Sequence, residues 1–429
     1  MLDSTLCNKN KKIWWMNIGI EVNWNNTDFI PKISNRENNG IIQGTEQLCL
    51  LLADSQDIVI LNKSPDELII ENLKKLGIMI PEIWIVADRG TPLSECILNN
   101  SNLMKQIFEL NKEMKVQLIP YGVSRTEEKI QQITGCAMFG PTYKQALWIN
   151  SKVNARILSK KLGFNTTEGY ICNTISELQY YGKLLFSESI NTKVVLKENY
   201  GASGKGLLIF SSYRSFSAFI KRSKVEGKDL NIIIEKWYET IIDLNYQIII
   251  EDSGHVNYVA PKEQLMSSGK YIGSRFPIYL DKEVSNILKK SAYELGDLLH
   301  EKGYRGIFSI DAIIDKNKNI YPLIEINGRF SLSTYLSRIP EYVGLDKHCL
   351  VRYYDLGNEW NLNYISKLLS TYLYDAKTKT GVIFSSFTQG SNNVKSRLFV
   401  VLIETTQYKV ELLKNSLDEI LIKRNVRIN

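Results

Sequence analysis

Apolar residues in the first part of the chain recur in two alternating patterns, short continuous runs and a spacing of three or four. Residues 57–61 form such a run and are expected to be a buried strand. Residues 64–67 then have the pattern of a capping box, with Pro65 at the first helical position. One face of this helix carries Ile69, Leu73 and Leu76, and Gly77 is expected to end it. Further strands are expected at 82–86 and 116–119, so this order predicts a small α/β domain with a mainly parallel sheet.

The pattern changes in the middle of the chain. Ser151 is placed to cap a helix that Gly163 ends. Runs of strand-forming residues then dominate, at 194–197, 232–235, 246–250, 306–314 and 320–327. A helix at 284–299 interrupts them. Strands with a segregated helix predict an α+β module that is distinct from the first domain.

A smaller strand–helix unit is expected at the end of the chain. Its strands lie near 381–387 and 398–403, and one helical side then carries Val410, Leu413, Leu417 and Ile420. A single hydrophobic core rarely grows past about 250–300 residues, so a chain of 429 residues should form two or three domains. We expect three, at residues 1–140, 141–350 and 351–429.

Composition narrows the class of protein. The chain is 44% hydrophobic and 23% charged, as soluble globular proteins are, and no apolar run approaches the roughly 20 residues that span a bilayer. Six scattered cysteines without a CxxC pair predict reduced thiols in a cytoplasmic protein. The net charge of +7 is spread without a basic tract, so we expect neither a nucleic-acid nor a membrane partner. The three histidines lack metal-ligand spacing, so chemistry should depend on Lys, Arg, Asp, Glu and backbone amides.

The first signal of chemistry is a glycine- and serine-rich segment that follows the strand ending at Lys197. It contains Ala202, Ser203, Gly204, Lys205 and Gly206. Glycines let backbone N–H groups approach phosphate oxygens, and lysines add charge. A flexible hairpin loop is the alternative. The segment is not a Walker A loop, because Asn199 replaces the first glycine and Gly206 replaces Ser or Thr, and no kinase HRD or DFG motif follows.

The second signal is a pair of strands joined by a polar turn. Glu325 and Asn327 are two residues apart and so share one face, and a hairpin centred near Lys318 would place Asp311 opposite Glu325. Two carboxylates and an amide oxygen suit Mg²⁺ that also holds nucleotide phosphates. The alternative is a plain hairpin, with Asn327-Gly328 as a turn and Asp311 as an edge residue.

A third segment lies between these two signals. The strand at 232–235 runs into charged and aromatic residues through Glu239, which suit a hinge whose backbone contacts an adenine edge, with Asp243 for the ribose. An ordinary strand end is the alternative.

The order of these segments resembles the ATP-grasp superfamily from about Pro141 to Val343. The resemblance implies a preceding α/β domain of the pre-ATP-grasp kind, an α+β ATP-grasp core and a C-terminal strand–helix unit. The residues that would contact ATP are Lys152, Lys197, Ala202, Ser203, Gly204, Gly206, Glu235, Lys236, Trp237, Tyr238 and Asp243. Asp311, Glu325 and Asn327 would hold Mg²⁺, two ions being usual and Mn²⁺ an alternative, and Arg329 completes a Glu-x-Asn-x-Arg pattern.

One position departs from the pattern of several amino-acid ligases in this superfamily. They carry an arginine two positions before the magnesium aspartate, where this chain has Ser309. Arg329, Arg305 and Arg275 are the candidates to replace it, and Arg329 and Arg275 are expected to stabilise the reacting groups. The alternative for Arg275 is an exposed loop arginine. The region that starts at Lys262 is where substrate and phosphate loops fall in the superfamily.

The resemblance implies an ADP-forming ligase that activates a carboxylate as an acyl phosphate and passes it to an amine. Within the superfamily, the chain is similar to the pheganomycin-type peptide ligases and the butirosin-type amino acid–carrier-protein ligases. We therefore expect amino acid or peptide substrates in secondary metabolism such as antibiotic biosynthesis, and the assembly is compatible with a homodimer. Transfer to an acyl-carrier-protein thiol is the alternative, which the net positive charge favours, and a phosphotransferase or a non-catalytic nucleotide-binding module is another.

Overall fold

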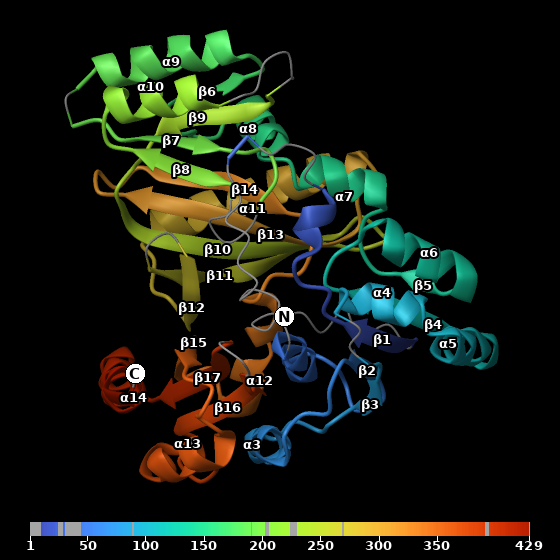
Figure 1. The fold of residues 1–429 in the computed structure, drawn as a ribbon. Helices are drawn as coiled ribbons and strands as arrows, with labels where there is room; N and C mark the ends of the chain where they lie inside the picture. Colours follow the sequence, from blue (N-terminus) through green and yellow to red (C-terminus); the bar gives the residue numbers. More distant parts are fainter. Residues whose placement is uncertain are drawn as a thin grey trace.

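The computed structural model describes residues 10–24, 29–30, 44–87, 90–189, 191–201, 206–223, 230–267, 270–390 and 394–428. Within these residues the strands form three sheets, of five, eight and four strands (Figure 1). No helix in the described ranges has both the length and the apolar character needed to cross a membrane.

The N-terminal domain is built on a five-stranded parallel sheet of order β3-β2-β1-β4-β5. Its strands are β1 (Lys11–Trp15), β2 (Ile58–Leu61), β3 (Glu82–Ile85), β4 (Val116–Pro120) and β5 (Ala137–Met138). Its helices are η1 (Ile20–Asn23), η2 (Thr45–Leu51), α3 (Glu67–Leu76), α4 (Leu93–Leu98), α5 (Ser101–Glu113) and α6 (Arg125–Thr134). The predicted parallel α/β domain is confirmed.

The start of α3 corrects one prediction. Asp66 rather than Ser64 caps the helix, because its side chain accepts from the amide of Leu68, and Pro65 lies before the helix. Gly77 ends α3 in the left-handed region, at φ 99°, as predicted. The first strand, β1, had not been predicted.

A four-stranded sheet of order β6-β9-β7-β8 forms a separate layer under two helices, at the top of Figure 1. Its strands are β6 (Gly169–Cys172), β9 (Ile232–Lys236), β7 (Val194–Lys197) and β8 (Leu207–Phe210). The covering helices are α9 (Ile175–Ser187) and α10 (Tyr213–Arg222). Cys172, Leu178, Val194, Phe216 and Ile232 belong to their common core. Helices α7 (Tyr143–Ile149) and α8 (Lys152–Lys161) precede this layer in the chain, and Ser151 caps α8 as predicted.

The largest sheet has eight strands in the order β14-β13-β10-β11-β12-β15-β17-β16, and all of its pairs are antiparallel. Its first five strands in this order are β14 (Ile320–Asn327), β13 (Gly306–Asp315), β10 (Thr240–Ile250), β11 (Val256–Ser267) and β12 (Lys270–Phe276). They continue into β15 (His348–Leu356), β17 (Ser396–Glu404) and β16 (Gly381–Thr388). The predicted α+β core and C-terminal unit therefore share one sheet, and the expected boundary at 350/351 falls inside β15.

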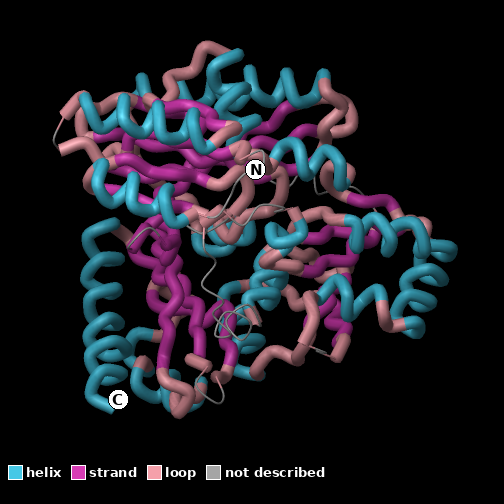
Figure 2. Tube along the Cα trace, turned by 45° about the horizontal axis from the view of Figure 1, so that its top comes forward, coloured by secondary structure: helices cyan, strands magenta, loops and turns pink. Residues whose placement is uncertain are grey.

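Helices cover both ends of this sheet. Helix α11 (Lys282–Glu301) packs on β10, β11 and β14, and α14 (Gln407–Ile428) packs on β15 and β17, as Figure 2 shows for the long C-terminal helix. The remaining helices are η3 (Thr334–Leu336), α12 (Ile339–Val343), α13 (Leu362–Leu368) and η4 (Ser370–Tyr372). One apolar core joins the N-terminal domain to the C-terminal unit, because Trp14 and Leu73 share it with Phe384 and Leu398. This packing fixes the N-terminal domain beside the sheet that carries the candidate site.

Candidate functional site

The two predicted metal carboxylates face each other across β13 and β14. Asp311 pairs with Glu325, and Ser309 pairs with Asn327, which confirms the register predicted from the hairpin. Lys318 lies in the turn, in the left-handed region at φ 64°. Because cross-strand partners share one face of a sheet, Asp311, Glu325 and Asn327 form one group of oxygen donors.

Amide side chains from neighbouring strands fix the Asp311 carboxylate. Its Oδ1 accepts from Asn245 Nδ2 at 2.7 Å and from Gln264 Nε2 at 2.6 Å. Burial and the nearby charge of Glu325 raise the pKa of Asp311 to about 6. The two carboxylates thus have more negative charge than the described groups around Asp311 neutralise, which suits a divalent cation.

Lys152, the first residue of α8, connects the carboxylates to the glycine-rich segment. Its ammonium lies 3.0 Å from Glu325 Oε1 and donates to the carbonyl of Gly201 at 2.6 Å. Asn199 holds the start of α8, because its side chain accepts from the Ser151 hydroxyl and its carbonyl accepts from the Lys152 amide. The predicted ATP-contacting lysine therefore touches two other parts of the predicted site.

Lys197 forms an ion pair with Glu235 on the neighbouring strand β9. Glu235 is 4% exposed and also accepts from Arg156 at 2.8 Å and from the Thr167 hydroxyl at 2.7 Å. Burial opposes the charge of this carboxylate, but Lys197 and Arg156 outweigh it and lower the pKa of Glu235. Glu235 thereby positions Lys197.

Arg156 had not been identified from the sequence. It follows Lys152 by four residues on α8, so the two side chains share one helical face, and this spacing was the available signal. Arg156 also donates to the carbonyls of Thr167 and Gly169. It thus ties α8 to β6.

The predicted adenine hinge follows Glu235 at the end of β9. The side chain of Lys236 pairs with Glu168 at 2.6 Å and with Glu188, and the Trp237 amide donates to the carbonyl of Lys193. The Tyr238 hydroxyl accepts from the Glu168 amide at 3.3 Å. These contacts hold the segment in place, and its adenine role stays a prediction.

Asp243 lies on β10 and accepts from the Thr240 hydroxyl at 3.1 Å. Burial raises the pKa of this carboxylate, which lies in the same strand as Asn245. Its role with a ribose also stays a prediction.

The glycine-rich segment is described in part. Ala202, Ser203 and Gly204 lie outside the described residues. Gly206 is in the left-handed region at φ 76°, where its carbonyl accepts from the Glu198 amide at 2.8 Å and closes the base of the segment. A side chain at this position would be strained and would contact Glu198.

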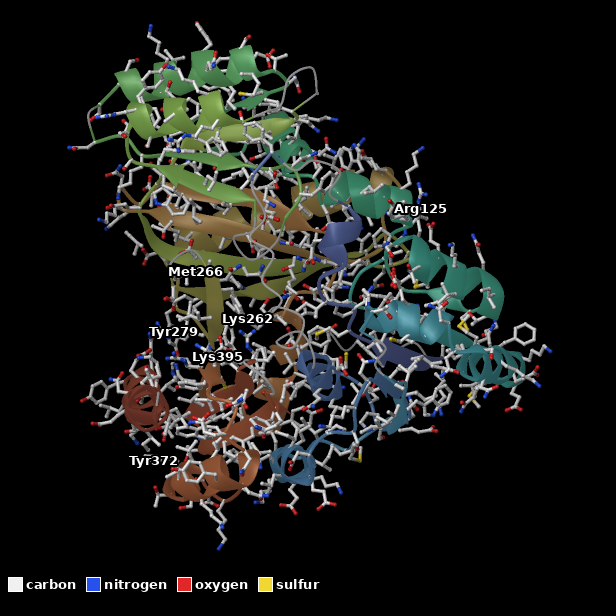
Figure 3. The ribbon with its side chains drawn as sticks, in the orientation of Figure 1. Arg125, Lys262, Met266, Tyr279, Tyr372 and Lys395 are labelled. Carbon is white, nitrogen blue, oxygen red and sulfur yellow. The ribbon has the colours of Figure 1, made fainter. Side chains whose placement is uncertain are left out.

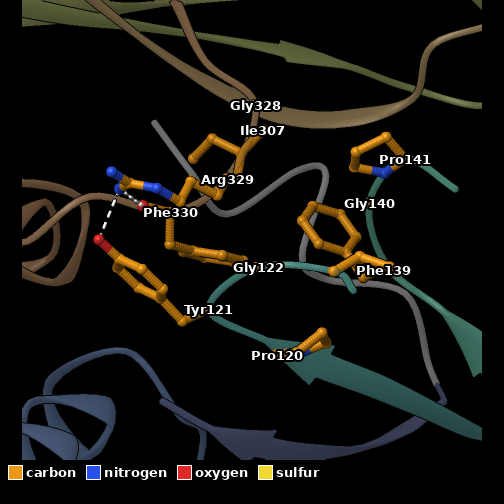
Figure 4. A pocket seen from close by; sticks show the side chains of 11 residues that line it. Pro120, Tyr121, Gly122, Phe139, Gly140, Pro141, Ile307, Gly328, Arg329 and Phe330 are labelled. Carbon is orange, nitrogen blue, oxygen red and sulfur yellow. Dashed lines mark hydrogen bonds between the residues drawn. The ribbon is translucent and has the colours of Figure 1, made fainter. Parts of the chain in front are cut away.

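The predicted catalytic arginines are held by acidic or carbonyl partners. Arg329 donates to the Tyr121 hydroxyl at 2.5 Å (Figure 4). It also pairs with Glu21 at 2.8 Å. Arg275 pairs with Glu263 at 2.8 Å and with Glu411 of α14. The sequence could not show Tyr121, Glu21 or Glu411 as partners, because these three residues come from other units of the chain.

The third candidate, Arg305, donates to the carbonyls of His300 and Tyr304. Arg329 lines a small pocket with residues after β4, including Tyr121 and Gly122 (Figure 4). The structure therefore places Arg329 at the junction with the N-terminal domain, and Arg275 at the junction with α14. Their catalytic roles remain predictions.

No group of three or more His, Cys, Asp or Glu side chains gathers as a metal site among the described residues. The candidate cation site accordingly consists of two carboxylates and the Asn327 amide.

Residues 151–345 match the family described as the ATP-binding domain of the carbamoyl-phosphate synthase L chain. This part of the chain belongs to the ATP-grasp family. The chain is 28% identical over 337 residues to "[Butirosin acyl-carrier protein]--L-glutamate ligase" of Niallia circulans, covering 78% of this chain and 76% of that protein.

Many solved structures share the fold of this ATP-grasp chain, and two of them cover nearly all of it. N5-carboxyaminoimidazole ribonucleotide synthetase in its ADP complex has a TM-score of 0.60 at 14% identity, over 95% of this chain and 96% of that one. Biotin carboxylase from Campylobacter jejuni has a TM-score of 0.61 at 14% identity, over 96% and 92%. The predicted fold class is confirmed, and the chain is an ATP-dependent, ADP-forming ligase of this family.

Proposed function

We propose that this ATP-grasp ligase binds ATP with Mg²⁺ between Lys152, Lys197 and the Asp311–Glu325 pair, and uses it to activate an amino-acid carboxylate. The observation that carries the proposal is the position of Lys152. It contacts Glu325 on the eight-stranded sheet and Gly201 in the glycine-rich segment. A triphosphate at this point would meet lysine charge on one side and metal ligands on the other.

Asp311, Glu325 and Asn327 would hold the metal. Their oxygens are the hard donors that Mg²⁺ prefers. Burial and the nearby Glu325 charge raise the pKa of Asp311, and a cation at this point would favour its charged form. When bound, Mg²⁺ would supply charge neutralisation for the phosphate oxygens. Lys152 and Lys197 would grip the triphosphate, and the hinge from Glu235 to Tyr238 would contact the adenine.

The proposed reaction has two steps. A carboxylate oxygen of the acyl donor attacks the γ-phosphorus, the bond to the leaving oxygen of ADP breaks, and an acyl phosphate forms. An amine nitrogen then attacks the acyl carbon, the carbon–oxygen bond to phosphate breaks, and the nitrogen gives up a proton. Both steps depend on positioning and charge neutralisation, which lysine, arginine and metal can provide.

The acyl donor is proposed to be an amino acid, because the relative from Niallia circulans is named as an L-glutamate ligase. That name also supports a second candidate, in which the acceptor is the thiol of an acyl-carrier protein. The net charge of +7 fits an acidic carrier-protein partner. An amine acceptor and a thiol acceptor share the first step.

The test measures ADP release with ATP, Mg²⁺ and each amino acid in turn, beginning with L-glutamate, and adds hydroxylamine to trap the acyl phosphate as a hydroxamate. We expect one amino acid to give both ADP and hydroxamate. Acceptors are then compared, free amino acids against an acidic carrier protein with and without phosphopantetheine. ATP consumption that never yields hydroxamate or coupled product would refute ligation and indicate a phosphotransferase.

A further inference from the structure

A lysine lies in the same cross-strand row as the proposed metal ligands. Lys262 on β11 pairs with Asn245 on β10, Asn245 pairs with Asp311, and Asp311 pairs with Glu325. Cross-strand partners share a face, so all four side chains project from the same side of the sheet. Two strand spacings, about 10 Å, separate the backbones of Lys262 and Asp311.

Lys262 is buried with little to offset its charge. It is 5% exposed, donates to the Ser337 hydroxyl at 3.0 Å and lies 5.7 Å from the centre of the Phe276 ring (Figure 3 labels it near the middle of the molecule). Among the described residues it has no ion pair with a carboxylate. Burial lowers the pKa of Lys262 to about 8.

Four other cations of the described part of the site already have carboxylate partners. Lys152 pairs with Glu325, Lys197 with Glu235, Arg329 with Glu21 and Arg275 with Glu263. Glu263 is next to Lys262 on β11, but it alternates to the other face and pairs with Arg275. A buried ammonium without a counterion is costly, and an anionic ligand removes that cost.

We infer that Lys262 binds the oxyanion that reacts beside the metal row, and so supplies a positive charge that Ser309 on β13 lacks. This inference rests on the proposed function, because the oxyanion is the carboxylate of the acyl donor or the phosphoryl group transferred to it. Ser309 cannot supply the charge itself, because its side chain is a neutral hydroxyl that is buried and donates to Asn245 Oδ1 at 3.0 Å. Ser337 orients the Lys262 ammonium.

The direct test follows the Lys262 ammonium by NMR in the full chain labelled with ¹³C,¹⁵N-lysine, with Lys262→Arg used to assign its signal. The protein is titrated with pH as the MgADP complex, alone and with inorganic phosphate or with L-glutamate. We expect phosphate, L-glutamate or both to raise the pKa of Lys262 by at least about one unit, because an anion favours the charged form. The arm that raises it identifies the source of the oxyanion.

The groups that face Lys262 do not themselves change its pKa during the titration. They are Asn245 from β10, the Phe276 ring from β12 and Ser337 after η3, and none of them titrates in this range. Asp311 and Glu325 are the charged residues of the row. MgADP is bound in all three titrations, so these two residues have the same surroundings in each. A pKa of Lys262 that neither anion moves, with MgADP bound, would overturn this inference alone, whereas failure to bind MgADP would overturn the proposed function with it.

Variants give an independent measurement. Lys262→Met should weaken phosphate binding to the MgADP complex by about tenfold or more, since a hydrogen bond to a charged group contributes about 1.5–3 kcal/mol. Lys262→Arg should restore most of it, and ADP affinity should stay within about twofold in both. Lys290→Met, on the exposed face of α11, is the matched control. Phosphate binding by Lys262→Met that equals the wild type would contradict the inference.

Discussion

The Lys152 ammonium lies 3.0 Å from the Glu325 carboxylate, although the two residues are 173 positions apart in the chain. The lysine thus offsets the charge of a carboxylate that is proposed to hold Mg²⁺. The same side chain reaches the carbonyl of Gly201 in the glycine-rich segment. One residue therefore links the nucleotide and the metal parts of the site.

This contact predicts opposite effects of Lys152→Met on two ligands. Binding of Mg²⁺ without nucleotide should become tighter, because the lysine no longer offsets the Glu325 charge. Binding of ATP should weaken by about tenfold, because a charged phosphate contact is lost. Calorimetric titrations with each ligand check both directions, and weakening of both ligands would contradict the competition.

Glu325→Ala should abolish ADP formation, by at least about 100-fold, while the chain stays folded. Glu325 is partly exposed and its loss removes metal charge rather than core volume. The measurement is steady-state ADP release, with circular dichroism for the fold. Glu294→Ala on α11, an exposed carboxylate, is the control. Turnover near that of the wild type would contradict the metal role.

The pKa of Asp311, raised from 3.8 to about 6, predicts how stability depends on pH in the metal-free protein. The folded state holds this proton more tightly than the unfolded state, so stability falls as pH rises from about 4 to about 6, by up to about 3 kcal/mol. Asp311→Asn should remove this loss, and Mg²⁺ should reduce it. Urea unfolding at pH 4, 5, 6 and 7 tests the difference between wild type and variant. If the stability difference between the wild type and Asp311→Asn does not change over this pH range, the charge of Asp311 is compensated and the prediction is wrong.

The Arg156–Glu235 pair predicts a dependence of the opposite sign. Arg156→Leu should lower the free energy of unfolding by about 3 kcal/mol, because it leaves a buried carboxylate with one fewer cation. The pKa of Glu235 is lowered from its usual 4.5, so the stability it contributes is present above pH 4.5 and is lost as pH falls below it. Denaturant titrations of Glu235→Gln should show a destabilisation that shrinks below pH 4.5. A destabilisation by Glu235→Gln that stays constant with pH would argue against a charged Arg156–Glu235 pair.

The parts predicted from the sequence are those that depend on local spacing. The Asp311–Glu325 register follows from a symmetric hairpin about Lys318, and the end of α3 follows from Gly77. The parallel sheet of the N-terminal domain follows from alternating strands and helices. In each case neighbouring residues contain the information.

The parts that were missed depend on contacts between distant segments. The partners of Arg329 and Arg275, Glu21 and Glu411, come from the two ends of the chain, where no local pattern points to them. The boundary at 350/351 divides β15, because its pairing with β12 continues the core sheet into the C-terminal unit. Burial of Lys262 likewise depends on Ser337 and Phe276, which lie far from it in sequence.

Asp311, Glu325 and Asn327 are proposed to hold the cation that accompanies the nucleotide. Anomalous scattering from crystals of the full chain grown with ADP and Mn²⁺ tests it most directly. We expect a manganese peak within about 2.5 Å of oxygens from Asp311 and Glu325 and in contact with the phosphates of ADP. Bound ADP with no manganese at these side chains, or with manganese held elsewhere, would contradict it.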